Sequence, residues 1–197
     1  MLQPPVGLKR ERKGGLIMAE CSDYFGDSNE QIYTQSLSDI QAGLVANMDN
    51  VTGATADSIW VLIRCSGDNQ KAKGALYDDS DPRERVAETD EITLTNNNTA
   101  TWYEFTFLSP PTLTANAEYA LMAWSEAASD QLMVSPLGSD TLVVRAQSYD
   151  GWPETLNLAN EFNIYWVSMY CCYSGGSALG TSSTTLQGGF LRGASLS

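Results

Sequence analysis

Hydrophobic and polar residues alternate along the middle of the chain with a period of two, the pattern of a β-strand that buries one face. The clearest stretch is Asp57–Cys65. One face of this predicted strand carries Ile59, Val61, Ile63 and Cys65, and the other carries Ser58, Trp60, Leu62 and Arg64. We therefore expect the first face to lie in a hydrophobic core.

Two later stretches repeat this pattern. Trp102–Leu108 places Tyr103, Phe105 and Phe107 on one face. Phe162–Tyr173 is apolar on both sides, with Tyr165, Val167, Met169 and Cys171 on one face and Ile164, Trp166 and Tyr170 on the other. These three stretches are predicted as central strands, and the expected core contains Ile59, Val61, Ile63, Phe105, Phe107, Tyr119 and Leu121.

Shorter strands are predicted between turns rich in Gly, Pro, Asn and Asp. They cover Gln31–Leu37, Ala42–Met48, Ala72–Tyr77, Val86–Leu94, Glu118–Trp124, Leu132–Val134 and Thr141–Arg145. No stretch has a convincing helical period. Many short strands with regular turns predict an all-β fold, an antiparallel two-sheet sandwich of the jelly-roll type.

The sandwich is predicted over residues 24–173, with an extended arm at each end. The N-terminal arm, residues 1–23, contains Pro4-Pro5 and Gly14-Gly15, and the C-terminal arm, residues 174–197, is rich in Gly, Ser and Thr. Such segments cannot form a core alone. Each arm carries a short apolar anchor, and the anchor residues are Leu16, Ile17, Met18, Phe190 and Leu191. We expect both arms to lie on neighbouring subunits.

Charge and length narrow the classes of partner. The 197 residues carry a formal net charge of −13, which disfavours binding to nucleic-acid phosphates. No segment has the ~18 consecutive apolar residues that a membrane-spanning helix needs. The charged run Lys9–Lys13 is followed by too short an apolar stretch for a secretory signal, so we expect no Sec-type export.

Candidate reactive groups are few. The chain has no histidine, which excludes Ser-His-Asp and Cys-His catalysis and histidine-bound zinc. The four cysteines, Cys21, Cys65, Cys171 and Cys172, match no zinc-binding spacing. Adjacent Cys171 and Cys172 point to opposite faces of a strand, so at most one of them can face Cys65. Two alternatives remain open: buried free thiols, or one disulfide from Cys65 to either Cys171 or Cys172.

Two kinds of ligand are considered. The acidic turn after Tyr77 contains Asp78, Asp79 and Asp81, whose carboxylates are the oxygen ligands that Ca²⁺ prefers. Exposed aromatic rings can stack on sugars, and the candidate glycan-facing residues are Trp60, Trp102, Trp124 and Trp152. Paired carboxylates can hydrolyse glycosides without histidine, but no pair is singled out here. We expect no catalysis and no tightly bound cofactor.

About 60% of the chain resembles a loosely defined set of β-sandwich modules. The residues that carry the resemblance are Thr55–Ile63, Lys71–Ser80, Trp102–Phe107, Leu113–Leu121, Gly151–Pro153 and Asn163–Val167. Such modules are found in archaeal and bacterial surface proteins and in virus structural proteins. The resemblance implies a jelly-roll-like fold, and it carries over no activity and no catalytic residues.

These observations favour a structural subunit of a large assembly. We expect a virion protein, in a capsid, decoration or tail-associated role, that assembles in a host cytoplasm and contacts copies of itself and other virion proteins through its arms. One alternative is a carbohydrate-binding β-sandwich module, with surface glycans as partners. A second alternative is an extracellular filament or surface-layer subunit at the cell surface.

Overall fold

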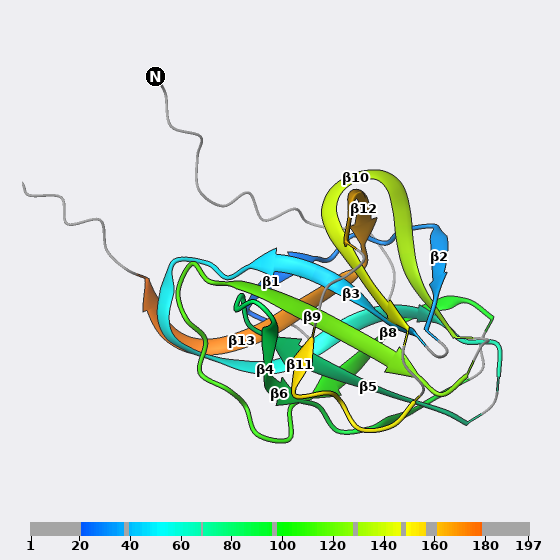
Figure 1. Ribbon diagram of the computed structural model, residues 1–197, viewed down its shortest axis with the longest axis horizontal. Helices are drawn as coiled ribbons and strands as arrows, with labels where there is room; N and C mark the ends of the chain where they lie inside the picture. The colour runs from blue at the N-terminus through cyan, green and yellow to red at the C-terminus, as the bar shows by residue number, and fades with distance from the viewer. Residues whose placement is uncertain are drawn as a thin grey trace, which may run out of the picture.

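The computed structural model describes residues 21–37, 40–67, 69–95, 98–127, 130–146, 149–156 and 161–178. Within these ranges the backbone forms strands joined by turns, without a helix (Figure 1). The strands are β1 (Asp23–Asp27), β2 (Tyr33–Ser36), β3 (Ile40–Asn47), β4 (Val51–Arg64), β5 (Gln70–Tyr77), β6 (Arg83–Glu88), β7 (Ile92–Leu94), β8 (Ala100–Thr106), β9 (Glu118–Ser125), β10 (Gln131–Ala146), β11 (Thr155–Leu156), β12 (Glu161–Val167) and β13 (Met169–Ala178).

The strands form two antiparallel layers that face each other. In the first layer β1 pairs with β13, β13 with β4, and β4 with β8. In the second layer β10 pairs with β3, β3 with β9, and β9 with β5, which continues to β6 and β7. This arrangement confirms the predicted antiparallel two-sheet sandwich.

The core lies between the two layers and is built from the inner faces that the alternation predicts. The seven predicted core residues are all buried, with exposed fractions of 4% or less: Ile59, Val61, Ile63, Phe105, Phe107, Tyr119 and Leu121. The opposite face of β4 is also largely buried, because Trp60 and Leu62 are only 8% and 2% exposed. The central strand is therefore covered on both sides.

β10 joins the two layers, and the sequence did not predict its length. Leu132–Val134 and Thr141–Arg145 were predicted as separate strands, whereas one strand runs from Gln131 to Ala146. Its first part pairs with β4 through Leu132 and Ile63, and its second part pairs with β3. The register against β12 shifts between Pro136 and Asp140, so the strand bends as it passes from one layer to the other.

The predicted strand Phe162–Tyr173 is in fact two strands that meet at Ser168. Residues before Ser168 form β12 and pair with β10, and residues after it form β13 and pair with β4. The Ser168 amide donates to the Met133 carbonyl at 3.1 Å, and its carbonyl accepts from the Leu62 amide at 3.0 Å. Ser168 is thus the point at which the chain changes partner strand.

The predicted strand Val86–Leu94 is also interrupted. Thr89 forms an isolated bridge with Phe107, and the Asp90 amide donates to the Thr106 carbonyl at 2.9 Å. These two residues therefore contact β8 in the first layer. The continuous segment from β6 through Thr89 and Asp90 to β7 therefore covers one side of the sandwich.

Strand pairing extends into both predicted arms. β1 begins at Asp23, and β13 continues to Ala178, where Ala178 pairs with Val51. The ladder therefore reaches five residues past Tyr173, the predicted end of the sandwich. Residues 1–20 and 179–197 lie outside the described residues, and with them all five predicted anchors: Leu16, Ile17, Met18, Phe190 and Leu191.

Candidate assembly surface

The tryptophans that were predicted to face a glycan are mostly buried. Trp124 is fully buried, Trp152 is 4% exposed and Trp60 is 8% exposed, while Trp102 is half-buried. A sugar ring needs a free aromatic face to stack on. The prediction is therefore wrong for Trp60, Trp124 and Trp152, because neighbouring side chains and loops cover their rings.

Two of these tryptophans belong to an aromatic cluster on the outer face of the first layer, centred on Tyr170. The ring of Trp60 is stacked parallel to that of Tyr170 with centroids 6.2 Å apart, and the rings of Trp102 and Tyr24 approach it at 5.1 Å. Tyr170 is only 3% exposed, whereas Tyr24 is 44% exposed. The cluster is a small second core, and Tyr24 is its most accessible ring.

A disulfide between Cys21 and Cys172 borders this cluster. Both alternatives that the sequence left open are therefore wrong for these two cysteines, while Cys65 and Cys171 are buried free thiols. Burial raises the pKa of the Cys171 thiol, so its reactive thiolate is strongly disfavoured. The predicted opposition of Cys171 and Cys172 is confirmed: Cys171 lies in the main core with Cys65, and Cys172 lies in the outer aromatic cluster.

The outer face of the second layer is covered by the segment Tyr149–Leu156. Lys73 Nζ lies 4.9 Å from the ring centroid of Trp124 and 4.5 Å from that of Tyr149, which is cation–π geometry. Partial burial lowers the pKa of Lys73. The Tyr149 hydroxyl donates to Glu91 Oε2 at 2.9 Å, and the other oxygen of Glu91 is 2.6 Å from Lys71 Nζ. These contacts hold the segment against β5 and β9.

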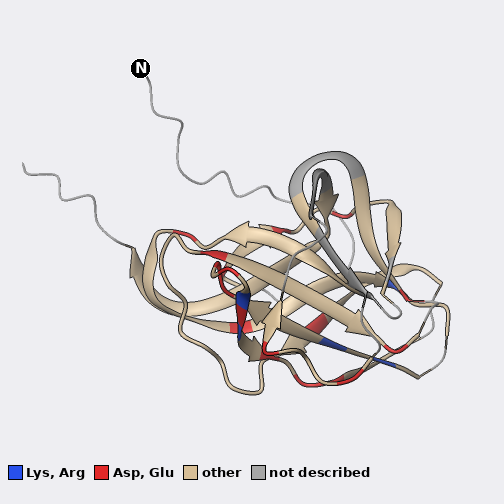
Figure 2. Cartoon of the chain, viewed as in Figure 1, with Lys and Arg blue, Asp and Glu red and all other residues tan. Residues whose placement is uncertain are grey.

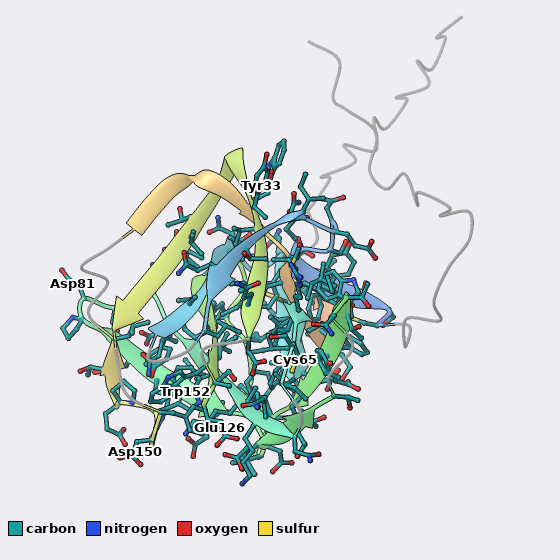
Figure 3. All side chains as sticks on the ribbon, turned by 90° about the vertical axis from the view of Figure 1, so that its right-hand side faces the viewer. Tyr33, Cys65, Asp81, Glu126, Asp150 and Trp152 are labelled. Carbon is teal, nitrogen blue, oxygen red and sulfur yellow. A yellow bond between two sulfur atoms is a disulfide. The ribbon has the colours of Figure 1, made fainter. Side chains whose placement is uncertain are left out.

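The acidic turn that was predicted to bind calcium uses one of its carboxylates internally. Asp78 Oδ1 accepts hydrogen bonds from the amides of Ser80 at 3.1 Å and Glu84 at 2.9 Å. The Ser80 hydroxyl also donates to Asp78 Oδ1. Although burial alone would raise the pKa of Asp78, the bond from this hydroxyl and the two amide bonds lower it. Asp79 and Asp81 are exposed, and Asp81 marks the turn in Figure 3. No three acidic or cysteine side chains in the described ranges are grouped as metal ligands, and calcium binding stays a prediction.

Three of the six large apolar side chains that are exposed among the described residues lie near one end of the sandwich. Ile32 is 79% exposed, Tyr33 is 54% exposed and Trp166 is 43% exposed. Figure 3 shows Tyr33 at an edge of the molecule, pointing outward and far from Trp152 and Asp150. Ile32 and Tyr33 are two adjacent bulky apolar residues left in water, and they indicate a surface that contacts another molecule.

Tyr33 and Trp166 lie on strands at the two sides of β10, and Ile32 directly precedes β2. Tyr33 pairs with Val134 of β10, and Val134 pairs in turn with Val167 of β12. Trp166 pairs with Ser135, the next residue of β10, so its side chain points to the opposite sheet face from Tyr33 and Val134. In the described residues β2 pairs with β10 alone, so β2 is the outermost strand here. We call Ile32–Ser36 the β2 edge.

The β2 edge is held in place by Ser168. The Ser168 hydroxyl is buried, accepts from the Gln31 amide at 2.9 Å and donates to the Asn29 carbonyl at 2.7 Å. At the other end of β2 the Leu37 amide donates to the Asp130 carbonyl at 2.9 Å, which continues the ladder with β10. The residue pattern predicts a strand here but does not single out its exposed residues, although Ile32-Tyr33 directly follows a polar loop.

Comparison with protein-family models and with curated proteins gives no match. None of the described residues belongs to a helix that is long and apolar enough to cross a membrane.

Proposed function

We propose that the protein is a structural subunit of a large assembly, a virion protein in a capsid, decoration or tail-associated role. Its terminal segments make the contacts between subunits, and its partners are further copies of the chain and other virion proteins. The observation that carries this proposal is the unequal distribution of charge between the terminal segments and the sandwich.

The terminal segments are basic and the sandwich is acidic. Residues 1–20 and 179–197 contain five of the 11 Lys and Arg residues but only two of the 24 Asp and Glu residues. Figure 2 shows acidic residues on many strands and turns of the sandwich, and basic residues at few places. Opposite charges attract over several ångströms in water, so the terminal segments are drawn to sandwich surfaces.

The basic residues of the sandwich leave much of its negative charge unmatched. Arg83 is paired with Glu118, and Arg85 lies 2.8 Å from Glu154. Lys71 is paired with Glu91. Since residues 21–178 contain 22 acidic and six basic residues, most of the acidic side chains have no basic counterpart within this range. The run at residues 9–13 contains four basic residues and one acidic residue, so its charge is opposite in sign to that of the sandwich.

Ordering a terminal segment of about 20 residues costs ~1–2 kcal/mol for each residue in backbone entropy. A few apolar anchors such as Phe190 and Leu191 do not offset that cost alone. Many backbone hydrogen bonds to an existing sheet, as in strand addition, make up the difference. An assembly subunit with an accessible sheet edge meets this requirement, and the β2 edge is such a place.

The other expectations belong to the same proposal. The strongly acidic sandwich argues against nucleic acid as a partner. We also propose that the protein is not an enzyme and does not insert into a membrane. Burial of Trp124 and Trp152 removes the main support for a carbohydrate-binding module.

A second candidate, an extracellular filament or surface-layer subunit, is favoured by the disulfide between Cys21 and Cys172. Disulfides persist on virions and cell surfaces and are rare in reducing cytosol. Both candidates place the working protein outside the cytosol. They differ in the partner, which is either other virion proteins or copies of the same chain alone.

The test is the mass of the purified chain under oxidising conditions, measured by light scattering over a range of concentrations. The full chain should form large particles, and chains that lack residues 1–20 or 179–197 should remain folded but assemble poorly. High salt should weaken assembly because it screens charge. A full chain that stays monomeric at every concentration, or truncated chains that both assemble normally, would refute the proposal.

A further inference from the structure

The C-terminal segment and the β2 edge lie at opposite ends of the sandwich. β13 begins next to Ser168, whose hydroxyl contacts Gln31 just before β2, and ends ten residues later at Ala178. Ten residues of strand span roughly 30 Å. Figure 1 shows the same separation, with the end of β13 at the left and β2 toward the right. Residues 179–197 therefore start far from the β2 edge of their own chain.

In the part of the chain that the structure describes, the β2 edge lacks the usual protection of an outer strand. Natural proteins guard exposed strand edges with charged residues or proline, because unpaired backbone groups recruit other chains. β1 carries Asp23 and Asp27, and β8 carries the exposed Glu104. In contrast, β2 consists of Tyr-Thr-Gln-Ser and follows the exposed Ile32. This edge is built to accept a strand.

The C-terminal segment has the composition of a strand that suits this edge. Residues 181–187 read Thr-Ser-Ser-Thr-Thr-Leu-Gln, which is uncharged and rich in β-branched threonine. Phe190 and Leu191 follow and can cover exposed apolar side chains. The single charge of the segment is Arg192, opposite in sign to the exposed Glu30 beside the β2 edge. Polarity and charge therefore match between donor and receiver.

We propose that residues 181–191 of one copy add as a strand to the β2 edge of the next copy, so that subunits join head to tail. This inference rests on the proposed assembly function and names its contact. The same chain is a poor donor to itself, because about nine extended residues would be needed only to return along the sandwich. Those nine residues, 179–187, include the whole threonine-rich stretch.

A head-to-tail contact uses two different surfaces of the subunit. Such heterologous contacts generate rings when the rotation closes and filaments when it does not. The inference thus favours a ring or a filament, such as a tail tube or fibre, over an assembly that rests on a two-fold contact between identical patches.

Two complementary variants test the contact. The receiver variant carries Ile32→Lys and Tyr33→Lys, which block the β2 edge, so it can only donate its C-terminal segment. The donor variant ends at Ala178 and lacks that segment, so it can only receive a strand at its intact β2 edge. Both changes affect exposed or terminal positions, and unchanged thermal unfolding will show that the sandwich is intact. Each variant alone should be monomeric, and an equimolar mixture should form a dimer of one copy of each.

The other outcomes overturn the inference in distinguishable ways. If each variant alone assembles like the full chain, assembly uses other surfaces, and the proposed function survives without this contact. If the mixture stays monomeric while the full chain assembles, the segment binds elsewhere. If the full chain itself never assembles, both proposals fail. The control Tyr24→Lys, at an exposed aromatic residue on a different strand, should assemble normally.

Discussion

The hydroxyl of Ser168 accepts a hydrogen bond of 2.9 Å from the amide of Gln31, 137 residues earlier in the chain. It also donates to the carbonyl of Asn29 at 2.7 Å. One buried side chain therefore fixes the loop before β2 to the point where the chain passes from β12 to β13. The position of the β2 edge depends on this contact.

Ser168→Ala should lower the free energy of unfolding by about 1–3 kcal/mol, because the Gln31 amide and the Asn29 carbonyl lose a partner that water cannot fully replace. Urea unfolding measures the change. Ser174→Ala is the matched control: Ser174 is exposed and bonds to Asp57 at 3.0 Å, so its loss should cost less than about 0.5 kcal/mol. Equal effects of the two substitutions would contradict the role given to Ser168.

A second prediction concerns Gly43, where β3 passes close to β9. A Cβ atom on Gly43 would lie 1.9 Å from the carbonyl oxygen of Leu121, so the two strands cannot keep their spacing around a larger residue. Gly43→Ala should destabilise the fold by about 1–3 kcal/mol or more. Gly151→Ala is the control, because a Cβ there would have no neighbour within 4 Å. Thermal unfolding of both variants gives the comparison, and a neutral Gly43→Ala would refute the close packing.

Alternation predicted the core of the sandwich well. Val61 and Phe105 were placed inside from their spacing alone, and both are fully buried. Period-two patterns report only which residues share a face, so they gave no sign that Ser168 ends one pairing and begins another. They also could not show that β10 is continuous, because its bend lies between two apolar stretches.

The candidate sites were harder to predict because they depend on contacts between distant segments. The disulfide joins Cys21 to Cys172 across 151 residues, and spacing gave no reason to choose this pair. Burial of Trp124 depends on the loop that carries Tyr149 and Trp152. The exposure of Ile32 and Tyr33 follows from the position of β2 at the edge of a layer, which only the fold reveals.

The cluster of Glu91, Lys71 and Tyr149 should make stability depend on acid pH. The hydrogen bond from Lys71 holds the pKa of Glu91 below its ordinary value of 4.5. A carboxylate with a lowered pKa contributes stability that is present above its unfolded pKa and is lost as the pH falls through its folded pKa. Stability should therefore drop on acidification from about pH 6 to about pH 3 more steeply in the natural chain than in Glu91→Gln.

Denaturant unfolding at several pH values measures this difference. Tyr149→Phe removes one hydrogen bond to Glu91 but keeps the ring that contacts Lys73, so it should reduce the pH dependence only in part. Identical pH profiles for the natural chain and Glu91→Gln would show that the cluster does not contribute.

The disulfide should contribute much of the free energy that holds β1 against the rest of the sandwich. Phe25 is the one buried side chain of this strand. Its other contacts include the ladder with β13, the packing of the Tyr24 ring on Tyr170 and the bond from Cys21 to Cys172. Cys21→Ser with Cys172→Ser should lower the free energy of unfolding by about 2–5 kcal/mol, because the bond closes a very long loop in the unfolded chain. Hydrogen exchange should quicken in β1 before it does so in β4.

Reductant supplies the control. It should lower the melting temperature of the natural chain toward that of the double-serine variant and leave the variant unchanged. Cys65 and Cys171 are buried in the core, so alkylation after mild reduction should label Cys21 and Cys172 first. Because residues 1–20 directly precede Cys21, loss of the bond also frees the point from which the basic N-terminal segment leaves the sandwich. This release would explain weaker assembly in the presence of reductant. A melting temperature that does not change when reductant is added would show that the bond does not support β1.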